Sequence, residues 1–275
     1  MEMLDKAEVV SHQIMGDPRY KIMKLVLRTE IAREGQPGQF VHVQVSTGID
    51  PLLRRPISIA DIDREGGELT LLYRIKGKGT EVLAKVKAGE SLSLMGPLGH
   101  GFTLPEQGEL ILVAGGIGAF PLLPLAKAAR AKDIPVRLYW GGEDEDFFAA
   151  AGLGLWQDAG IPVFLSSMDG SIGAKGNVLD LIRENSPDSM AAQGPGCSVA
   201  VCGPQVMMKA VSEHFLQTGA SVEVSLEERM GCAVGACLGC VCTLKDENSG
   251  RIYRGKVCQD GPVFQGKEVL WDYEQ

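Results

Sequence analysis

The sequence predicts a β plus α/β protein: an antiparallel β-barrel, then a parallel-sheet α/β unit, then a small cysteine-rich segment. Three observations predict this order. Apolar and polar residues alternate through residues 1–104, short apolar strands alternate with helical segments in 105–224, and five of the seven cysteines lie in the final part, 225–275. Alternation with period two is typical of antiparallel sheets, whereas alternating strands and helices favour a parallel sheet.

The first unit is expected to contain five strands, separated by Gly, Pro and Asp residues that favour turns. The expected strands are 20–29, 38–46, 54–62, 68–76 and 91–99. One segment, 79–89, has Val82, Leu83 and Val86 at helical spacing and ends at Gly89, which predicts a short helix.

The second unit is expected to contain four short apolar strands, at 109–116, 135–142, 162–170 and 198–204. Helices are expected at 118–131, 144–159, 176–184 and 205–218. Strands of this kind are typical of a parallel sheet covered by helices on both faces. The third part, from about residue 226, has too little apolar mass for a core of its own, and a metal cluster could supply the missing constraint.

Composition excludes several classes of function. The chain has 275 residues, 45% of them hydrophobic, and its 27 basic and 35 acidic residues give a net charge of −8. We therefore expect it to bind neither nucleic acid nor an anionic membrane surface. The first residues, MEMLDKAEVV, lack the basic and apolar regions of a signal peptide, so a cytoplasmic protein is expected.

Four cysteines have the spacing of an iron–sulfur site. Cys232, Cys237 and Cys240 follow the pattern C-x4-C-x2-C, and Cys258 lies further along the chain. This is the plant-type spacing for a 2Fe–2S centre. Glycine and alanine between the cysteines allow the backbone to fold around inorganic sulfide and to direct N–H groups at it.

Two other interpretations of these cysteines remain open. A structural zinc site usually has two short cysteine pairs, and this segment has one C-x2-C. A thioredoxin-type redox pair requires a helix start beside a βαβ unit, which Cys237 and Cys240 lack. Cys242 is the spare cysteine, and we expect it to be a small buried hydrophobic residue.

Glycines follow two of the strands expected in the α/β unit. Gly115, Gly116 and Gly118 lie between a strand and a helix, where a nucleotide diphosphate or nicotinamide can approach the backbone, although a plain tight turn would look the same. The triplet Cys202-Gly203-Pro204 follows another strand, at the sheet edge where α/β proteins bind ligands. Cys202 is interpreted either as a core residue or as a small neighbour of the reacting ring.

Two motifs of the barrel suit a flavin nucleotide. In RRPISI, Arg55 can pair with a diphosphate and Ser58 can form a hydrogen bond to a flavin ring atom. Further on, Gly77, Gly79 and Thr80 precede the expected short helix and can bind a diphosphate through backbone N–H groups. The plainer alternative is that Arg54 and Arg55 form an exposed strand end.

The carboxylates at 143–146 bear on the choice of nicotinamide cofactor. This run, Glu-Asp-Glu-Asp, follows the second strand of the α/β unit and would repel the 2′-phosphate of NADP, so NAD is expected. The alternative is that the run merely begins the next helix, where acidic residues suit the helix dipole.

Taken in order, the motifs RPIS, YR…GKGT, GPLGHGF, AGGIG, CGP and ERMGC…GAC…C resemble the ferredoxin–NADP reductase superfamily. The block SLEERMGCAVGACLGCVC with VCQDGPVF resembles the electron transfer subunits of dihydroorotate dehydrogenase B, and the likeness covers residues 5 to 266. It implies a FAD-binding barrel, an NAD-binding α/β domain and a 2Fe–2S segment. Electrons would pass from dihydroorotate through FMN on a separate catalytic subunit to the cluster, FAD and NAD⁺, in pyrimidine synthesis.

The resemblance also implies site residues. The implied FAD contacts are Arg55, Pro56, Ile57, Ser58, Leu72, Tyr73, Arg74, Gly79 and Thr80. The implied cluster ligands are the four cysteines named above. Ile57 departs from the wider superfamily, which often has a tyrosine there. The partner would be the FMN-containing subunit, in a heterotetramer with two copies of each chain.

We expect the loop around Met230, Val234, Leu238 and Pro262 to contact that partner, because electrons must enter the cluster from another protein. Two other functions remain in view. The chain could serve a hydrogenase, sulfite reductase or ferredoxin:NAD(P)H system, or it could be a zinc-stabilised, non-catalytic nucleotide-binding module.

Overall fold

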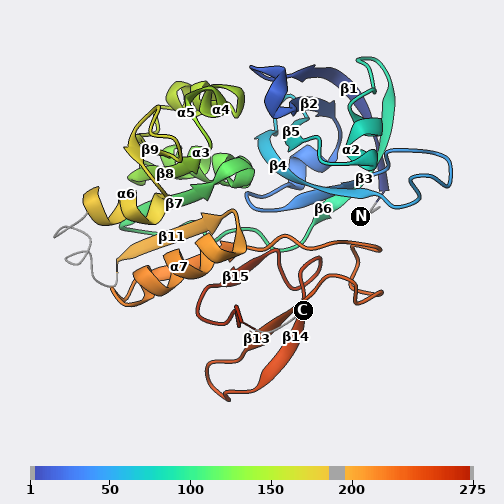
Figure 1. Ribbon diagram of the computed structural model, residues 1–275. Helices are drawn as coiled ribbons and strands as arrows, with labels where there is room; N and C mark the ends of the chain where they lie inside the picture. The colour runs from blue at the N-terminus through green and yellow to red at the C-terminus, as the bar shows by residue number, and fades with distance from the viewer. Residues whose placement is uncertain (1–3, 186–195, 273–275) are drawn as a thin grey trace.

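A computed structural model describes residues 4–185 and 196–272. Its first part is a closed barrel of six strands in the order β1-β2-β5-β4-β3-β6 (Figure 1). The strands are β1 (Leu4–Ile14), β2 (Ile22–Arg28), β3 (Phe40–Val43), β4 (Arg55–Asp63), β5 (Glu68–Arg74) and β6 (Ser91–Leu98). Three short helices join them: η1 (Pro18–Tyr20), α1 (Ile31–Glu34) and α2 (Lys78–Leu83).

Alternation fills the barrel as the sequence predicts. Leu25, Leu27, Leu69 and Leu71 are fully buried and form its interior with inward residues of the other strands. β1 was not among the predicted strands, and Ala7 and Val9 are its two buried positions. This strand pairs with both β2 and β6, so it closes the barrel.

The second part is a seven-stranded sheet in the order β10-β9-β8-β7-β11-β12-β15. Its strands are β7 (Glu109–Gly115), β8 (Val136–Gly142), β9 (Val163–Ser167), β10 (Ala174–Lys175), β11 (Cys197–Cys202), β12 (Ser221–Ser225) and β15 (Val263–Gln265). All are parallel except β15, which runs antiparallel to β12. The helices that accompany the sheet are η2 (Gly116–Leu122), α3 (Leu123–Arg130), α4 (Glu145–Ala150), α5 (Leu153–Asp158), α6 (Val178–Asn185) and α7 (Gln205–Leu216).

Two helices differ from the sequence prediction for local reasons. The helix expected at 144–159 is two helices, because Gly152 takes a left-handed conformation with φ 84° between them. The helix expected at 118–131 begins as the 3₁₀ helix η2, which contains Pro121. Proline has no N–H to donate, so regular α-helical hydrogen bonding starts only at Leu123.

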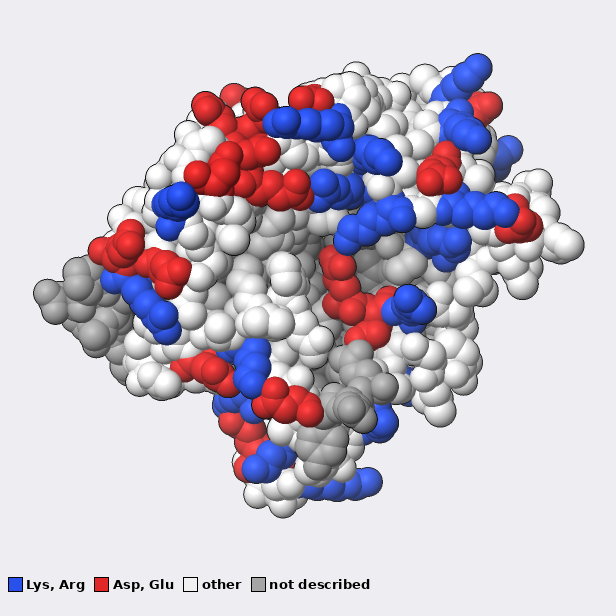
Figure 2. Space-filling view, in the orientation of Figure 1, with Lys and Arg blue, Asp and Glu red and all other residues white. Residues whose placement is uncertain are grey.

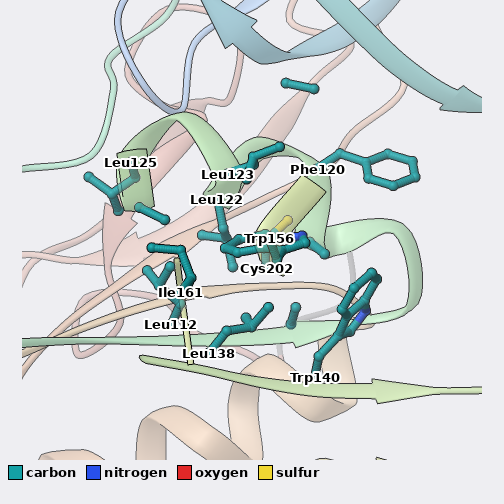
Figure 3. Packing of buried hydrophobic residues seen from close by; sticks show 14 of the residues in the cluster. Leu112, Phe120, Leu122, Leu123, Leu125, Leu138, Trp140, Trp156, Ile161 and Cys202 are labelled. Atoms are coloured by element: carbon teal, nitrogen blue, oxygen red, sulfur yellow. The ribbon is translucent and has the colours of Figure 1, made fainter. Parts of the chain in front are cut away.

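An aromatic core lies on the face of the sheet that α3, α4 and α5 cover. Trp140 and Trp156 are at most 1% exposed and pack with Phe147 and Phe148. Figure 3 shows Trp140 and Trp156 with the leucines of β7, β8 and the η2–α3 segment. This core fixes the strand ends from which the glycine loops emerge.

The cysteine-rich segment leaves the sheet after β12 and returns to it at β15. Between them lie the cysteine loop and a hairpin of β13 (Val241–Lys245) and β14 (Ile252–Lys256). The largely polar stretch 244–256 forms most of this hairpin. The hairpin projects below the two larger units in Figure 1.

Polar contacts join the barrel to the α/β unit. The Tyr20 hydroxyl donates to Asp144, and Arg19 pairs with Asp146 at 2.7 Å. Lys127 of α3 also pairs with Asp61 of β4. Contacts at both places hold the two units against each other.

Candidate functional site

A cavity opens where the barrel, η2 and the start of the cysteine segment meet. Its lining residues are Phe40, Pro56, Ile57, Ser58, Leu72, Tyr73, Arg74, Lys76, Thr80, Ile117, Phe120, Pro121, Ser225, Leu226, Glu227, Glu228, Met230 and Pro262. Seven of the nine FAD contacts implied by resemblance are among them. The wall is mainly apolar with a few polar groups, which suits a flavin ring.

The two remaining FAD contacts, Arg55 and Gly79, lie against each other. A Cβ on Gly79 would be 2.0 Å from Arg55 Nε, so the guanidinium packs directly on the bare backbone. Arg55 is held there by its own hydrogen bonds to the carbonyls of Leu53 and Arg54, at 2.6 and 3.2 Å. A guanidinium beside open backbone is a suitable cradle for a diphosphate.

Thr80 and Gly79 lie inside the first turn of α2 rather than before it. The Thr80 hydroxyl donates to the Gly77 carbonyl and accepts from the N–H groups of Lys76 and Gly77. Thr80 therefore fixes the turn that carries Gly79. Arg54 is half-buried rather than an exposed strand end, because its guanidinium donates to Ser93 O at 2.8 Å and to Ser93 Oγ at 2.9 Å.

Tyr73 is fixed in the cavity wall by a histidine of β1. His12 Nδ1 lies 2.8 Å from the Val86 carbonyl, which can only accept a hydrogen bond, so this nitrogen carries a proton. Nε2 lies 2.8 Å from the Tyr73 hydroxyl, so the ring and the phenol are hydrogen bonded. Burial raises the pKa of Tyr73 well above its usual value. The phenol therefore stays neutral and its ring stays in place.

A second cavity forms a groove along the carboxyl edge of the sheet. Its lining residues are Arg74, Lys76, Gly115, Gly116, Ile117, Gly118, Gly141, Gly142, Glu143, Met168, Gly176, Asn177, Val178, Gly203, Pro204, Met207 and Glu227. It contains all five glycine and proline positions that the sequence predicted as nucleotide contacts. Arg74, Lys76, Ile117 and Glu227 line both cavities, so the two sites adjoin.

The glycines of this groove are required by close approach. A Cβ on Gly118 would lie 2.3 Å from the Cys202 carbonyl oxygen, and one on Gly203 would lie 2.8 Å from Gly115 N. Gly116 has φ 56° and open space at its Cβ position. Gly118 and Gly203 allow the loops that follow β7 and β11 to lie side by side. Gly116 leaves backbone without a side chain facing the groove.

Cys202 lies beneath the groove rather than in it. Its side chain is 1% exposed and belongs to the hydrophobic core drawn in Figure 3. Burial raises the pKa of its thiol strongly, with a further contribution from the charge of Glu227, so the group is a neutral thiol. The backbone carbonyl of Cys202 packs against Gly118.

Glu227 is a site residue that the sequence reasoning missed. It lines the flavin cavity, the nucleotide groove and a third cavity between the start of α7 and the hairpin. No local sequence signal marked it, because its place in the site depends on contacts between segments far apart in the sequence.

The four carboxylates at 143–146 have separate positions. Glu143 lines the nucleotide groove and pairs with Arg74 at 2.7 Å. Asp144 caps α4 by accepting from Phe147 N, Asp146 pairs with Arg19, and Glu145 is exposed. The acidic run therefore does begin a helix, as the alternative interpretation held, while one of its members faces the groove.

The cysteine loop arranges its thiols as two pairs. The thiols of Cys232 and Cys237 interact with each other, and so do those of Cys240 and Cys258. In residues 4–185 and 196–272, no three His, Cys, Asp or Glu side chains are placed to hold a single metal ion. Two thiols for each of two irons is the arrangement that a 2Fe–2S cluster requires.

Backbone N–H groups surround these sulfurs. Gly235 N donates to Cys258 Sγ at 3.2 Å and Cys237 N to Cys232 Sγ at 3.3 Å. Hydrogen bonds, first from the N–H of Val234, lower the pKa of Cys232 to about 6, whereas burial raises that of Cys258 to about 12. Ala233 and Leu238 take left-handed conformations, φ 58° and 55°, that turn the backbone around the sulfurs.

The structure also locates Cys242 and the four residues that the sequence predicted as partner contacts. Cys242 is 1% exposed, as expected of a small buried residue, and burial raises its pKa to about 12. Val234 and Leu238 are exposed, at 38% and 63%. Pro262 is buried and lines the flavin cavity, so the prediction that it contacts a partner is wrong. Met230 is half-buried and lines the same cavity.

Known proteins match both parts of this arrangement. Residues 227–270 match the iron–sulfur cluster binding domain of dihydroorotate dehydrogenase B. The electron transfer subunit of dihydroorotate dehydrogenase B (NAD⁺) from Desulforamulus reducens is 43% identical over 244 residues, covering 88% of this chain and 90% of the relative. The subunit of the same name from Bacillus cereus strain B4264 is 42% identical over 259 residues, covering 90% and 93%.

Solved structures show the same fold. An NADH-dependent reduced ferredoxin–NADP oxidoreductase matches with a TM-score of 0.79 and 26% identity over 97% of this chain and 90% of that one. A ferredoxin NADP⁺ reductase from Neisseria gonorrhoeae, with bound FAD and NADP, matches with a TM-score of 0.65 at 14% identity, over 82% and 100%. The predicted barrel plus α/β fold is confirmed, and the predicted iron–sulfur segment agrees with the family match over residues 227–270. Because these two relatives are 43% and 42% identical over most of its length, the chain belongs to the family of electron transfer subunits of dihydroorotate dehydrogenase B.

Proposed function

We propose that this chain passes electrons from an FMN-containing catalytic subunit, which oxidises dihydroorotate, to NAD⁺ in pyrimidine synthesis in the cytoplasm. One observation carries the proposal: the flavin cavity is bounded by the cysteine segment on one side and by the nucleotide groove on the other. Met230 and Pro262 contribute the first wall, and Ile117 and Glu227 belong to both cavities. The path for electrons thus needs one flavin between the cluster and the nicotinamide.

The residues of the chain bind and orient the groups along this path. Arg55 on Gly79 would hold the diphosphate of FAD, while Pro56, Ile57 and Ser58 would lie along its ring and Ser58 would offer it a hydroxyl. Gly115, Gly116, Gly118, Gly203 and Pro204 would hold the nicotinamide nucleotide against that ring. When bound, FAD supplies the exchange between the one-electron chemistry of the cluster and the two-electron chemistry of NAD.

Cys202 acts through its neighbours in this proposal. Its neutral thiol is buried and its carbonyl packs on Gly118, so it sets the distance between the two nucleotide loops. Ser58 is the side chain that we assign to direct contact with the reacting ring, and Cys202 is a positioning residue.

The partner is assigned to the exposed side of the cysteine loop. Cys237, Val234 and Leu238 are exposed there, whereas Cys240 and Cys258 are buried. Electrons from a second protein would therefore enter through the Cys232–Cys237 pair. We propose a heterotetramer with two copies of each subunit. No helix in the part of the chain that the structure describes could cross a membrane.

The test compares the chain alone with the chain in complex. The FAD- and cluster-loaded chain alone should oxidise NADH with an artificial acceptor and show no activity with dihydroorotate. Adding the FMN-containing subunit should give dihydroorotate-dependent reduction of NAD⁺. Oxidation of dihydroorotate by this chain alone would contradict the proposal, and so would native co-purification with a hydrogenase or sulfite reductase subunit in its place.

A further inference from the structure

An ion pair closes across the nucleotide groove between the two large units. Arg74 is the last residue of β5 in the barrel, and Glu143 follows β8 in the α/β unit. Arg74 Nη1 lies 2.7 Å from Glu143 Oε1, and both residues line the groove. A dinucleotide that lies along the carboxyl edge of the sheet must pass this pair.

The Arg74–Glu143 pair is a contact between two side chains, and other contacts already hold the barrel and the α/β unit together. Tyr20 with Asp144, and Lys127 with Asp61, hold the barrel to the α/β unit. In Figure 2, acidic side chains gather over the α4–α5 region and basic side chains over the adjoining part of the barrel, and the two groups meet beside the hollowed centre of this face. Opening the Arg74–Glu143 contact therefore needs side-chain rotation only.

The chemistry of the two groups suggests what opens it. Arg74 is 28% exposed and Glu143 53% exposed, so water screens their attraction and the pair contributes little to stability. A guanidinium binds a diphosphate through two hydrogen bonds and with a greater opposing charge. A carboxylate released at the end of the second parallel strand accepts hydrogen bonds from ribose hydroxyls.

We propose that the Arg74–Glu143 ion pair is a latch that the dinucleotide opens by exchange. The diphosphate pairs with Arg74, assisted by Lys76 on the same wall. The adenosine ribose hydroxyls donate hydrogen bonds to the Glu143 carboxylate. A 2′-phosphate cannot take the place of that hydroxyl beside a free carboxylate, so Glu143 is the residue that selects NAD over NADP. This inference rests on the proposed NAD-linked function.

Binding to the oxidised, FAD- and cluster-loaded complex tests the exchange without turnover. Calorimetry would measure NAD⁺, NADP⁺ and inorganic pyrophosphate on wild type and on Glu143→Gln. NADP⁺ should bind at least about tenfold more tightly to the variant, and NAD⁺ should change by less than about threefold. Pyrophosphate should bind about two- to fivefold more tightly, because Arg74 has lost its competitor.

Two further variants separate exchange from simple repulsion. Glu145→Gln removes an exposed carboxylate two residues away and should leave all three affinities within about twofold of wild type. In an Arg74→Met background, Glu143→Gln should still favour NADP⁺ but should no longer tighten pyrophosphate. If Arg74→Met loses FAD, the response of pyrophosphate to Glu143→Gln alone decides the matter.

The outcomes distinguish this inference from the function on which it rests. Wild type that binds NAD⁺ while Glu143→Gln behaves like Glu145→Gln overturns the latch and leaves the function standing. Unchanged pyrophosphate affinity in Glu143→Gln also overturns the exchange. Wild-type complex that binds no NAD⁺ would overturn both.

Discussion

At the scale of single residues, cysteines of one short segment differ in their surroundings. Cys258 and Cys242 are both buried, but Cys258 Sγ accepts from Gly235 N and interacts with Cys240 Sγ, whereas Cys242 packs with Leu244 and Val257 in the core. Cys258→Ser should therefore lower iron from about two per chain and remove the visible absorption of the cluster. Cys242→Ser should keep both. The opposite pattern in iron analysis would refute the ligand assignment.

His42 predicts how stability depends on pH. It is 1% exposed in β3, and burial lowers its pKa to about 4. Between pH 7.5 and 5.5 the unfolded chain, with a histidine pKa of about 6.5, takes up the proton that the folded chain refuses. The free energy of unfolding should thus fall by about 1 kcal/mol over this range on account of His42.

Denaturant unfolding of the loaded chain at both pH values measures this contribution. His42→Leu should flatten the pH dependence by that amount, and replacement of the exposed His100 by Gln should leave it unchanged. An equal slope in wild type and His42→Leu would show that His42 does not carry it.

At the scale of elements, the packing of η2 on β11 depends on one glycine. A Cβ on Gly118 would meet the backbone of Cys202 and Gly203 at 2.3 and 2.8 Å, and backbone cannot yield as a side chain can. Gly118→Ala should cost about 1–3 kcal/mol of stability and weaken NAD⁺ binding. The same substitution at exposed Gly154 in α5, where a Cβ meets nothing within 4 Å, should raise stability by about 0.5–1 kcal/mol. Thermal unfolding of both variants checks the opposite signs.

The elements also show where sequence reasoning succeeds. Strands of the sheet such as β7 and β11 were predicted because their apolar runs are continuous, and the nucleotide glycines follow from their positions at strand ends. β1 was missed because only two of its residues, Ala7 and Val9, are buried, so its apolar pattern is too short to stand out. Glu227 and the Arg74–Glu143 pair depend on contacts between units far apart in the sequence, which no local pattern reports.

At the scale of the whole molecule, the exposed apolar residues of the cysteine loop should form part of the subunit interface. Leu238 is 63% exposed beside the Cys237 thiol. Leu238→Glu should weaken assembly with the FMN-containing subunit by at least about tenfold, because it would bury an unpaired charge. FAD content should stay normal. Ile14→Glu, at a 44% exposed position on the barrel, should assemble like wild type. Size-exclusion chromatography of the mixed subunits would show a normal complex with Leu238→Glu if the interface lies elsewhere.

The return of the chain to its starting point after the cysteine segment has an evolutionary consequence. Ser225, the last residue of β12, is paired directly with Val263, the first residue of β15. Everything between them, including the loop and hairpin, is thus inserted between two neighbouring antiparallel positions, which a tight turn could join on its own. Related proteins could gain or lose the cysteine loop and hairpin at this point while the order of the remaining strands stayed the same. The cysteine segment can therefore diverge separately from the barrel and the α/β unit.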